Sequence, residues 1–380
     1  MNYFLYNPVT QYDNTGDLLI NQSLVGLLRK HGQVIIDDSN KPEKFVTAIS
    51  AEGDQRLSAI SSQRLFDFLE HMLQRPRIAS KDTYYLVLVP GDLSVVGFNK
   101  AISRVRFFYR RLRKLKRLGC RILRLGISLN TFDLPNIIAE SLYSRAFYVY
   151  GVRDKQSMAK ATRFRFSHVH YFPDLAWAYR PNFVEIKAAE RKKSVLISFR
   201  ANQSGTVHNV DYFAGIKNHL LELLRYPAFE NYKIIVSYQV KYDREAAQEL
   251  ADLFYETFDV EFIDTLLSLE EAIQLYAGAD LIISNRLHVL LLGSICKTLS
   301  VPFINPLENK KIAGIYEDNG LYDMVLDYRD DIGKLNNKLA DLMGRSTDIL
   351  NLLEEQRKYN VHVIENVMED IVDTTGIVNH

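Results

Sequence analysis

Cysteine is scarce in this chain of 380 residues, which contains only Cys120 and Cys296. Two distant cysteines supply neither a disulfide framework nor a cysteine-rich zinc site, and they fit a reducing cytoplasm. Long hydrophobic runs are also lacking. The longest, such as 84–90 and 289–292, fall far short of the ~20 residues that span a bilayer. Residues 1–5 show neither the cationic start nor the apolar core of a secretion signal, so we expect a cytoplasmic protein.

Neither sign of charge is in excess, because 47 Lys and Arg face 46 Asp and Glu, for a formal net charge of +1. This balance disfavours a dedicated nucleic-acid binder, and we expect no nucleic-acid partner. Hydrophobic residues make up 47% and charged residues 24%, a globular composition that argues against disorder. At ~150 residues per domain, the length favours two domains.

Short apolar runs alternate with helical segments along the whole chain. They lie at 34–36, 84–89, 121–127, 147–152 and 169–172, and again at 194–198, 233–237, 261–263, 281–284 and 301–304. Continuous β-branched and aromatic runs between helices indicate parallel sheets with crossover helices. The pattern of strands and helices begins again at residue 194, after a gap. This repetition predicts an α/β fold with two Rossmann-like domains that face each other across a cleft, where ligands bind beyond the carboxyl ends of the strands.

We place the first domain at 1–180, the second at 194–345 and a C-terminal helical tail at 346–380. The charged stretch 179–193 is typical of a linker between domains. Residues 332–372 have a helical pattern, and we expect this segment to fold back across the interface of the two domains.

The first candidate site lies at Asn14, Thr15, Gly16 and Asp17, immediately before a helix. Asn14 or Thr15 can cap the helix, and Gly16 permits a close backbone approach. The free helix N-terminus would then suit an anion, or would place Asp17 toward the cleft. Taken alone, the segment is explained best as a helix cap.

Two further candidates also follow predicted strands. Arg153 stands at a strand end just before a helix, where it would either project into the cleft or form a surface ion pair with Asp154. The residues leave these two interpretations evenly balanced. Lys310 and Lys311 lie beyond the strand at 301–304, where two loop lysines are usually a solvated surface.

The most informative segment joins a buried strand ending at Ser284 to an apolar helix at 289–295, with Arg286 and His288 at the turn between them. Arginine and histidine between two apolar segments are costly unless they face a polar cleft. A guanidinium binds carboxylate or phosphate bidentately, and an imidazole transfers protons near neutral pH. A functional role is therefore favoured over a locally satisfied histidine.

Several familiar motifs are missing. The sequence has no Gly-Lys-Ser/Thr phosphate loop, no Gly-x-Gly-x-x-Gly, no Asp-x-Asp and no Gly-x-Ser-x-Gly. His168 and His170 could share one strand face, but no third ligand accompanies them. A structural histidine pair is favoured, and we expect no metal site.

Together, these segments resemble the polysaccharide pyruvyl transferase family, in the same order and over roughly residues 12–321. The segments that carry the resemblance are 14–20 (NTGDLLI), 152–157 (VRDKQS), 172–174 (FPD), 284–288 (SNRLH), 311–314 (KIAG) and 319–321 (NGL). The resemblance implies a fold like the two-domain GT-B glycosyltransferases, phosphoenolpyruvate as donor, a sugar of a polysaccharide or its lipid-linked precursor as acceptor, and no metal or other cofactor.

The same resemblance assigns roles to individual residues. The donor carries a carboxylate and a phosphate, so several cations from different strand ends would bind it: Arg153, Arg286 and Lys311. His288 would protonate the methylene carbon of the donor. Asp17 would orient or deprotonate an acceptor hydroxyl from the opposite domain, with Asn14 and Gly16 beside it on the acceptor side.

Two other functions stay open. In a GT-B glycosyltransferase that uses a nucleotide sugar, Arg286 and His288 would bind a diphosphate. Retaining enzymes of that kind often carry two glutamates eight positions apart, whereas Glu308 has Tyr316 at that spacing, which weighs against this alternative. The third is a non-catalytic glycan-binding module, which the pairing of Arg286 with His288 disfavours only in part.

A basic segment at 104–124 is predicted to form an amphipathic helix. It contains ten cations and no acid: Arg104, Arg106, Arg110, Arg111, Arg113, Lys114, Lys116, Arg117, Arg121 and Arg124. Its apolar stripe is predicted to pack on the first sheet: Val105, Phe108, Leu112, Leu115 and Leu118. Because the whole chain is nearly neutral, we expect these cations to bring the protein to the inner face of the cytoplasmic membrane as a peripheral protein.

Overall fold

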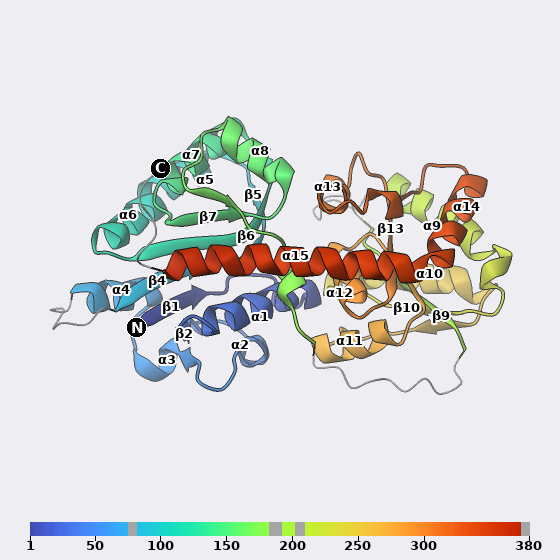
Figure 1. The fold of residues 1–380 in the computed structure, drawn as a ribbon, viewed down its shortest axis with the longest axis horizontal. Helices are drawn as coiled ribbons and strands as arrows, with labels where there is room; N and C mark the ends of the chain where they lie inside the picture. Colours follow the sequence, from blue (N-terminus) through green and yellow to red (C-terminus); the bar gives the residue numbers. More distant parts are fainter. Residues whose placement is uncertain (75–81, 182–191, 202–209, 374–380) are drawn as a thin grey trace. The chain divides into compact units, whose positions relative to one another are not determined.

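The computed structural model describes residues 1–74, 82–181, 192–201 and 210–373. By their internal contacts the residues form two compact units (Figure 1). The first unit comprises Met1–Tyr12, Ile20–Tyr179 and Tyr359–His380, and the second comprises Asp13–Leu19 and Arg180–Lys358. Most of the predicted linker, at 182–191, lies outside the described residues.

The first unit is built on a sheet whose described strands all pair in parallel, in the order β3-β2-β1-β4-β6-β7-β8. Its strands are β1 Asn2–Asn7, β2 Gln33–Ile36, β3 Gln55–Arg56, β4 Thr83–Leu88, β5 Gly91–Val95, β6 Arg121–Phe132, β7 Val149–Val152 and β8 Val169–Tyr171. The long strand β6 pairs first with β4 and then with β5. Pro90 separates β4 from β5, and proline cannot donate a hydrogen bond to a continuous ladder.

Helices connect these strands and pack on the sheet. They are α1 Thr15–Arg29, α2 Glu43–Ile49, α3 Leu57–Ile60, α4 Leu65–Gln74, α5 Phe98–Ser103, the π-helix η1 Arg104–Tyr109, α6 Arg110–Arg117, α7 Leu134–Ser144, α8 Lys155–Arg163 and the 3₁₀ turn η2 Leu175–Ala178. The core is aromatic as well as aliphatic. Phe4 of β1 and Tyr85 of β4 stack with ring centroids 4.6 Å apart, and both side chains are fully buried.

The predicted basic helix at 104–124 is corrected in two respects. The helix ends at Arg117, because Gly119 adopts a positive φ of 93° that reverses the chain, and Arg121 and Arg124 belong to β6 instead. Leu112 and Leu115 are buried as expected, but Phe108 is 51% exposed. The π-helix has a wider turn than an α-helix, so a stripe drawn at α-helical spacing misplaces Phe108.

The second unit repeats the plan with described strands in the order β11-β10-β9-β12-β13-β14, again all parallel. Its strands are β9 Ser194–Ser198, β10 Lys233–Val236, β11 Val260–Phe262, β12 Leu281–Ser284, β13 Leu299–Ile304 and β14 Leu326–Asp327. Its helices are α9 Val210–Leu224, η3 Pro227–Phe229, η4 Lys241–Asp243, α10 Arg244–Tyr255, α11 Leu269–Ala277, α12 Leu287–Ile295, α13 Lys310–Asp318, η5 Tyr322–Met324, α14 Ile332–Gly344 and α15 Ser346–Val372.

In the second sheet, β10 and β11 follow one another on one side of β9. The chain then returns to the other side of β9, where β12, β13 and β14 follow one another. The strand order therefore reverses between β9 and β12. In open parallel sheets, ligands bind beyond the carboxyl ends of the strands at such a reversal. The residues that follow β9 and β12 are thus the first place to look for a site.

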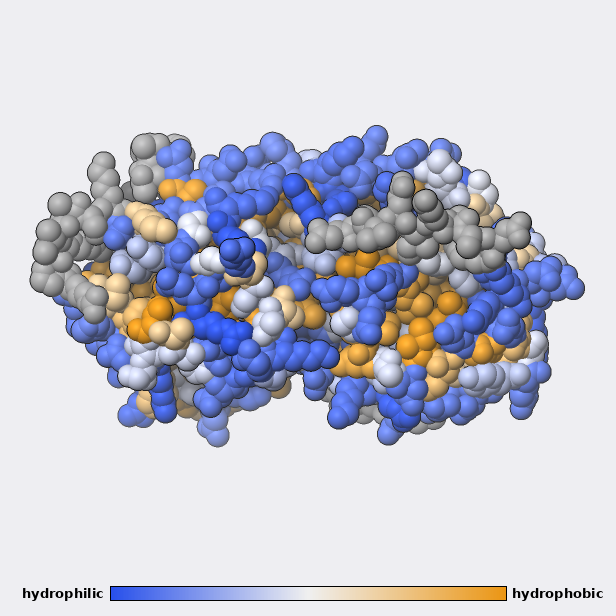
Figure 2. Space-filling model, turned by 90° about the horizontal axis from the view of Figure 1, so that it is seen from below, coloured by the Kyte–Doolittle hydropathy of each residue, from blue (hydrophilic) through white to orange (hydrophobic). Residues whose placement is uncertain are grey.

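The last helix, α15, contributes residues to both units, since the chain from Tyr359 onward groups with the first. Within that unit, the carbonyl oxygen of Ile371 accepts hydrogen bonds from Tyr85 Oη at 3.2 Å and Arg121 Nη1 at 2.9 Å. No helix among the described residues is both long and apolar enough to cross a bilayer. On the face shown in Figure 2, hydrophilic residues predominate and hydrophobic ones form smaller groups.

Candidate active site

The carboxyl ends of β9 and β12 are joined by polar side chains. Ser284 Oγ, at the end of β12, donates a hydrogen bond to the carbonyl oxygen of Ser198 at 2.5 Å. Asn285 then bonds both backbone groups of Arg200, accepting from its N–H at 2.8 Å and donating to its carbonyl oxygen at 3.0 Å. These bonds fix Arg200 beside the turn that carries Arg286.

Arg286 is held from two sides. Its Nη2 donates to the carboxylate of Asp243, and its guanidinium carbon lies 5.4 Å from the ring centroid of Tyr242. Arg286 is only 9% exposed, and its Nε is buried without an acceptor among the described residues. A buried donor without a partner costs roughly 1–3 kcal/mol. The guanidinium therefore has hydrogen-bonding capacity that an added anion would use.

Asp243 balances part of this positive charge. Its side chain is 2% exposed. Burial raises the pKa of the Asp243 carboxyl, while the charges of Arg286 and Arg200 oppose that rise. Two arginines thus act on one buried carboxylate, and the local charge is positive when Asp243 is ionised.

His288 stands on the first turn of α12, and its side chain is buried. No side chain caps this helix, whose N-cap residue is Arg286. A helix N-terminus of this kind attracts anions through its free N–H groups and its dipole. A Cβ atom on Gly293 would lie 2.3 Å from Ser300 Oγ, so glycine is what lets α12 pack this closely on β13.

The start of α1 belongs to the second unit. Asn14 is the cap, since its Oδ1 accepts from the N–H groups of Gly16 at 2.9 Å and Asp17 at 3.3 Å. The segment is anchored by an isolated antiparallel bridge between Asn14 and Val240, and by Thr15 Oγ1 donating to the carbonyl oxygen of Leu267 at 2.9 Å. The expectation that Asp17 acts from the opposite domain therefore changes, because Asp17 and His288 lie in the same unit.

Gly16 lies directly against His288. A Cβ atom at this position would be 2.6 Å from His288 Nδ1 and 2.8 Å from Gln239 Nε2, both closer than real Cβ contacts. Only glycine allows the helix start to approach the imidazole so closely. We call the group that surrounds this contact the strand-end cluster. Its members are Arg200, Gln239, Asp243, Arg286 and His288.

Lys311 lies at the start of α13, the helix that follows β13. Lys310 and Lys311 open α13 instead of lying on a loop, and the preceding Asn309 accepts from Arg200 Nη2 at 3.4 Å. Asn309 Nδ2 also donates to Tyr212 Oη at 3.4 Å. The structure thus brings Gly16 and Asp17 to the turn that carries Arg286 and His288, and it places Lys311 two residues after Asn309, which contacts Arg200.

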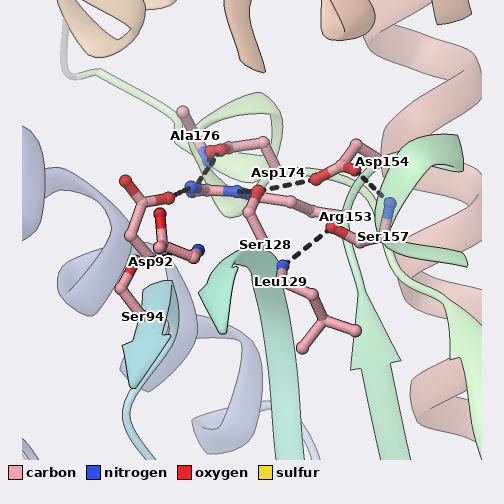
Figure 3. A network of polar contacts seen from close by, with 10 residues as sticks. Asp92, Ser94, Ser128, Leu129, Arg153, Asp154, Ser157, Asp174 and Ala176 are labelled. Atoms are coloured by element: carbon pink, nitrogen blue, oxygen red, sulfur yellow. Dashed lines mark hydrogen bonds and ion pairs between the residues drawn. The ribbon is translucent and has the colours of Figure 1, made fainter. Parts of the chain in front are cut away.

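Arg153 lies in the first unit, at the end of β7 (Figure 3). Its guanidinium donates from Nη1 to Asp174 at 2.8 Å, from Nη2 to Asp92 at 2.6 Å and from Nε to Ser128 Oγ at 2.7 Å. Asp154 does not pair with it on the surface. Instead Asp154 is buried, caps α8 through the N–H of Ser157 at 2.6 Å, and accepts from Ser128 Oγ.

The network in Figure 3 joins two of the segments that carry the family resemblance, 152–157 and 172–174. Burial lowers the pKa of Arg153, but Asp174, Asp92 and Asp154 together outweigh it, and the net effect is a raised pKa. The guanidinium is therefore firmly charged and already held by two carboxylates. Its role as a donor ligand stays a prediction.

Sequence reasoning missed three polar members of the cluster: Arg200, Gln239 and Asp243. Arg200 follows β9 just as Arg286 follows β12, so the rule that ligands bind beyond strand ends could have found it. Asp243 immediately precedes α10, and in the sequence it has the appearance of an ordinary helix start. Only the fold shows that it meets Arg286.

Neither cysteine offers a nucleophile. Cys120 and Cys296 are buried free thiols, and burial raises the pKa of each to about 12. Both are therefore protonated at neutral pH. Across the described residues, no group of three or more His, Cys, Asp and Glu side chains is arranged to hold a metal ion.

Solved structures with the same fold include UDP-GlcNAc 2-epimerases. UDP-GlcNAc 2-epimerase from Neisseria meningitidis bound to UDP-GlcNAc is 11% identical, with a TM-score of 0.61 over 98% of this chain and 100% of that one. S. aureus MnaA in complex with UDP is 10% identical, with a TM-score of 0.56 over 97% of this chain and 95% of that one. OtsA in its apo form is 11% identical, with a TM-score of 0.56 over 100% of both chains. At these identities the likeness shows the GT-B fold alone.

No curated protein shows significant sequence similarity to the chain. A family model does match: the model for polysaccharide pyruvyl transferase covers residues 14–306. The match begins at the helix cap beside His288, includes the Arg153 network and the strand-end cluster, and ends just after β13. The chain therefore belongs to the polysaccharide pyruvyl transferase family of enzymes.

Proposed function

We propose that this enzyme moves the pyruvyl group of phosphoenolpyruvate onto a sugar of a polysaccharide or of its lipid-linked precursor, and that the strand-end cluster binds the donor. The supporting observation is the buried Nε of Arg286, a cationic donor without an acceptor among the described residues. It lies beside Arg200 and the uncapped start of α12. Carboxylate and phosphate oxygens are the acceptors that such a group prefers.

Donor binding divides between the cations of the cluster. Arg286 takes the donor carboxylate or phosphate through Nε, while Asp243 and Tyr242 keep its guanidinium oriented. Arg200 and Lys311, at the ends of neighbouring elements, bind the remaining oxygens. Because cations neutralise the donor in this scheme, the proposed reaction needs no divalent metal.

His288 supplies the proton in the proposed reaction. It protonates the methylene carbon of phosphoenolpyruvate, which becomes the methyl group of the product. One acceptor hydroxyl adds to the neighbouring carbon and loses its proton, phosphate leaves, and a second hydroxyl of the same sugar adds and loses its proton. The products are a pyruvate ketal and inorganic phosphate. General acid–base assistance of this kind contributes ~10²–10⁴-fold.

The start of α1 serves the acceptor in this proposal. Asp17 orients a hydroxyl or accepts its proton, while Asn14 and Gly16 hold the helix start against the cluster. The reaction would take place at the cytoplasmic side of the membrane, in the synthesis of a cell-surface or exported polysaccharide.

A donor panel tests the proposal. The purified enzyme is incubated with a lipid-linked or soluble oligosaccharide acceptor, a metal chelator and either phosphoenolpyruvate or UDP-GlcNAc, and released phosphate and UDP are measured separately. We expect phosphate with phosphoenolpyruvate, an acceptor mass increase that matches a ketal, and no UDP from the nucleotide sugar.

The same panel separates the alternatives. Release of UDP with sugar transfer would show a nucleotide-sugar glycosyltransferase. Acceptor binding without turnover of either donor would show a glycan-binding module. A strict need for magnesium after chelation would contradict the proposed charge neutralisation by Arg200, Arg286 and Lys311.

A further inference from the structure

One surface of the first unit combines exposed apolar side chains with uncompensated positive charge. It is formed by α5, η1, α6 and α7, of which α5, η1 and α7 pack against one another (Figure 1). The N–H of Gly97, before α5, donates to Asp133 Oδ2 at 2.6 Å, and Asn136 Nδ2 donates back to Gly97 O at 3.0 Å. Arg104 of η1 pairs with the buried Glu140 of α7. These contacts fix the helices together.

Large hydrophobic side chains on this surface remain in contact with solvent. Exposed fractions are 65% for Phe98, 63% for Phe107 and 64% for Leu134, and others lie between 46% and 53%. The apolar members are Val96, Phe98, Ile102, Phe107, Phe108, Leu134 and Ile138. Phe98, Ile102 and Phe107 are spaced by four and five residues, which is one α-helical and one π-helical turn, so the π-helix keeps them on one face.

Cations flank these apolar groups. Residues 98–117 contain nine Lys and Arg and no acid: Lys100, Arg104, Arg106, Arg110, Arg111, Arg113, Lys114, Lys116 and Arg117. Arg111 and Lys114 pair with Asp67 and Glu70 of α4. Within the described part of the chain, Arg110, Arg113 and Arg117 have no carboxylate partner. We call this surface, with its apolar members, the apolar–basic surface.

We propose that the apolar–basic surface docks the enzyme onto an anionic lipid bilayer, with the phenylalanine and leucine side chains inserted among the headgroups and the cations bound to lipid phosphates. Exposed apolar side chains gain free energy by leaving water, and cations gain by approaching an anionic membrane surface. Both properties occur on the same helices here, and none of these four described helices is long and apolar enough to span a bilayer.

A lipid surface fits these residues better than a second copy of the chain. A two-fold dimer through this surface would bring Arg110, Arg113 and Arg117 of each copy toward the same residues of the other. A nucleic acid would use aromatic side chains as stacking platforms, but Ile102, Leu134 and Ile138 offer no ring for stacking. Aliphatic and aromatic groups together match the interface of a bilayer.

Vesicle flotation with the full-length enzyme tests the proposal. Vesicles of phosphatidylcholine alone are compared with vesicles that contain about 30% phosphatidylglycerol, at about 0.1 M and about 0.5 M salt. We expect binding to the anionic vesicles that weakens at high salt. Each cation near the surface contributes ~1 kcal/mol, or about fivefold in partitioning, so Arg110→Glu/Arg113→Glu should bind at least ~25-fold more weakly.

Insertion and charge are tested separately. Phe98→Ser/Phe107→Ser keeps every cation and should weaken binding by about tenfold or more, because the burial of two rings is lost. Tyr255→Ser is the apolar control, since Tyr255 is 52% exposed on α10 of the second unit. Lys44→Glu/Lys358→Glu is the charge control at exposed sites outside the surface. Both controls should bind like the wild type.

Four outcomes would overturn the proposal. The first is no binding to anionic vesicles at low salt, and the second is a loss of vesicle binding in the control variants as large as in the test variants. The third is a sedimentation experiment in which Phe98→Ser/Phe107→Ser converts a dimer to a monomer without affecting vesicle binding. The fourth is capture of single-stranded nucleic acid in preference to vesicles. Circular dichroism of each variant shows that it is folded, and soluble-acceptor turnover shows that the active site is intact.

Discussion

The substitution Gly16→Ala adds one methyl group and tests the position of His288 directly. The new Cβ would lie 2.6 Å from His288 Nδ1 and 2.9 Å from His288 Cβ, whereas ordinary contact begins near 3.4 Å. The contact with His288 Cβ cannot be relieved by rotating the ring alone. Either the imidazole or the start of α1 must therefore move by roughly 1 Å. A displacement of this size at a reacting group can cost about 10²-fold in rate.

Steady-state kinetics with phosphoenolpyruvate and a saturating acceptor measure the effect. We expect kcat for Gly16→Ala to fall by about 10²-fold, since a misplaced acid no longer reaches the methylene carbon. Gly26→Ala, on the same helix α1, is the matched control, because a Cβ at Gly26 meets nothing within 4 Å. Alanine favours the helix at both positions by up to ~1 kcal/mol, so helix propensity cannot explain a difference between them.

The thermal midpoints of the two variants separate catalysis from folding. Gly16→Ala should unfold within a few degrees of the wild type, because overpacking at a single contact costs about 1–3 kcal/mol and the helix propensity of alanine offsets up to ~1 kcal/mol of it. Turnover of folded Gly16→Ala within about threefold of Gly26→Ala would refute the assignment of His288 as the acid at this contact. Another residue would then have to be sought as the acid.

Three further predictions concern other parts of the molecule. Arg286→Ala should raise KM for the donor and lower kcat/KM by about 10²–10³-fold, while His288→Ala should mainly lower kcat; normal turnover of both folded variants would remove the cluster from the mechanism. Arg153→Ala leaves Asp174, 1% exposed, without its cation, and should lower the free energy of unfolding by about 3–5 kcal/mol in denaturant titrations. Asp174→Asn in the same background should restore part of that loss, and an unchanged midpoint in Arg153→Ala would contradict the network. Burial lowers the pKa of His168 and His170 below the usual 6.5. As the pH falls through 6.5, the unfolded chain therefore binds protons at these histidines before the folded protein does. The folded protein then loses the part of its free energy of unfolding that both neutral histidines provide above that pH. His168→Gln/His170→Gln should show a smaller drop in thermal midpoint between neutral and acidic pH than the wild type. An equal drop in the variant and the wild type would contradict this.

Much of the fold follows from the sequence because the strands are buried on both faces. Runs such as Leu281–Ile283 in β12 have no polar position, and only a covered parallel strand suits them. The predicted fold class and family are confirmed by the two parallel sheets and by the family match. Local geometry was harder to predict: the π-helix at Arg104–Tyr109 has no reliable sequence signal, and it displaced Phe108 from its predicted stripe.

The candidate site shows the same division. Arg286 and His288 could be found because an arginine and a histidine between two apolar segments stand out along the chain. Asp243 and Gln239 could not, since Asp243 precedes a helix, Gln239 lies in a loop, and both meet the cluster only through tertiary contacts. The grouping of Gly16 with His288, separated by most of the chain, depends on a close approach that no local pattern encodes.

Isothermal titration of phosphoenolpyruvate into the wild-type enzyme and into Arg286→Ala, in the presence of a metal chelator, tests the central claim most directly. If the strand-end cluster is the donor site, the wild type should bind one equivalent, inorganic phosphate should compete, and Arg286→Ala should lose at least about tenfold in affinity while Gly26→Ala loses none. Phosphoenolpyruvate binding that survives unchanged in folded Arg286→Ala, or that is absent from the wild type, would contradict the claim.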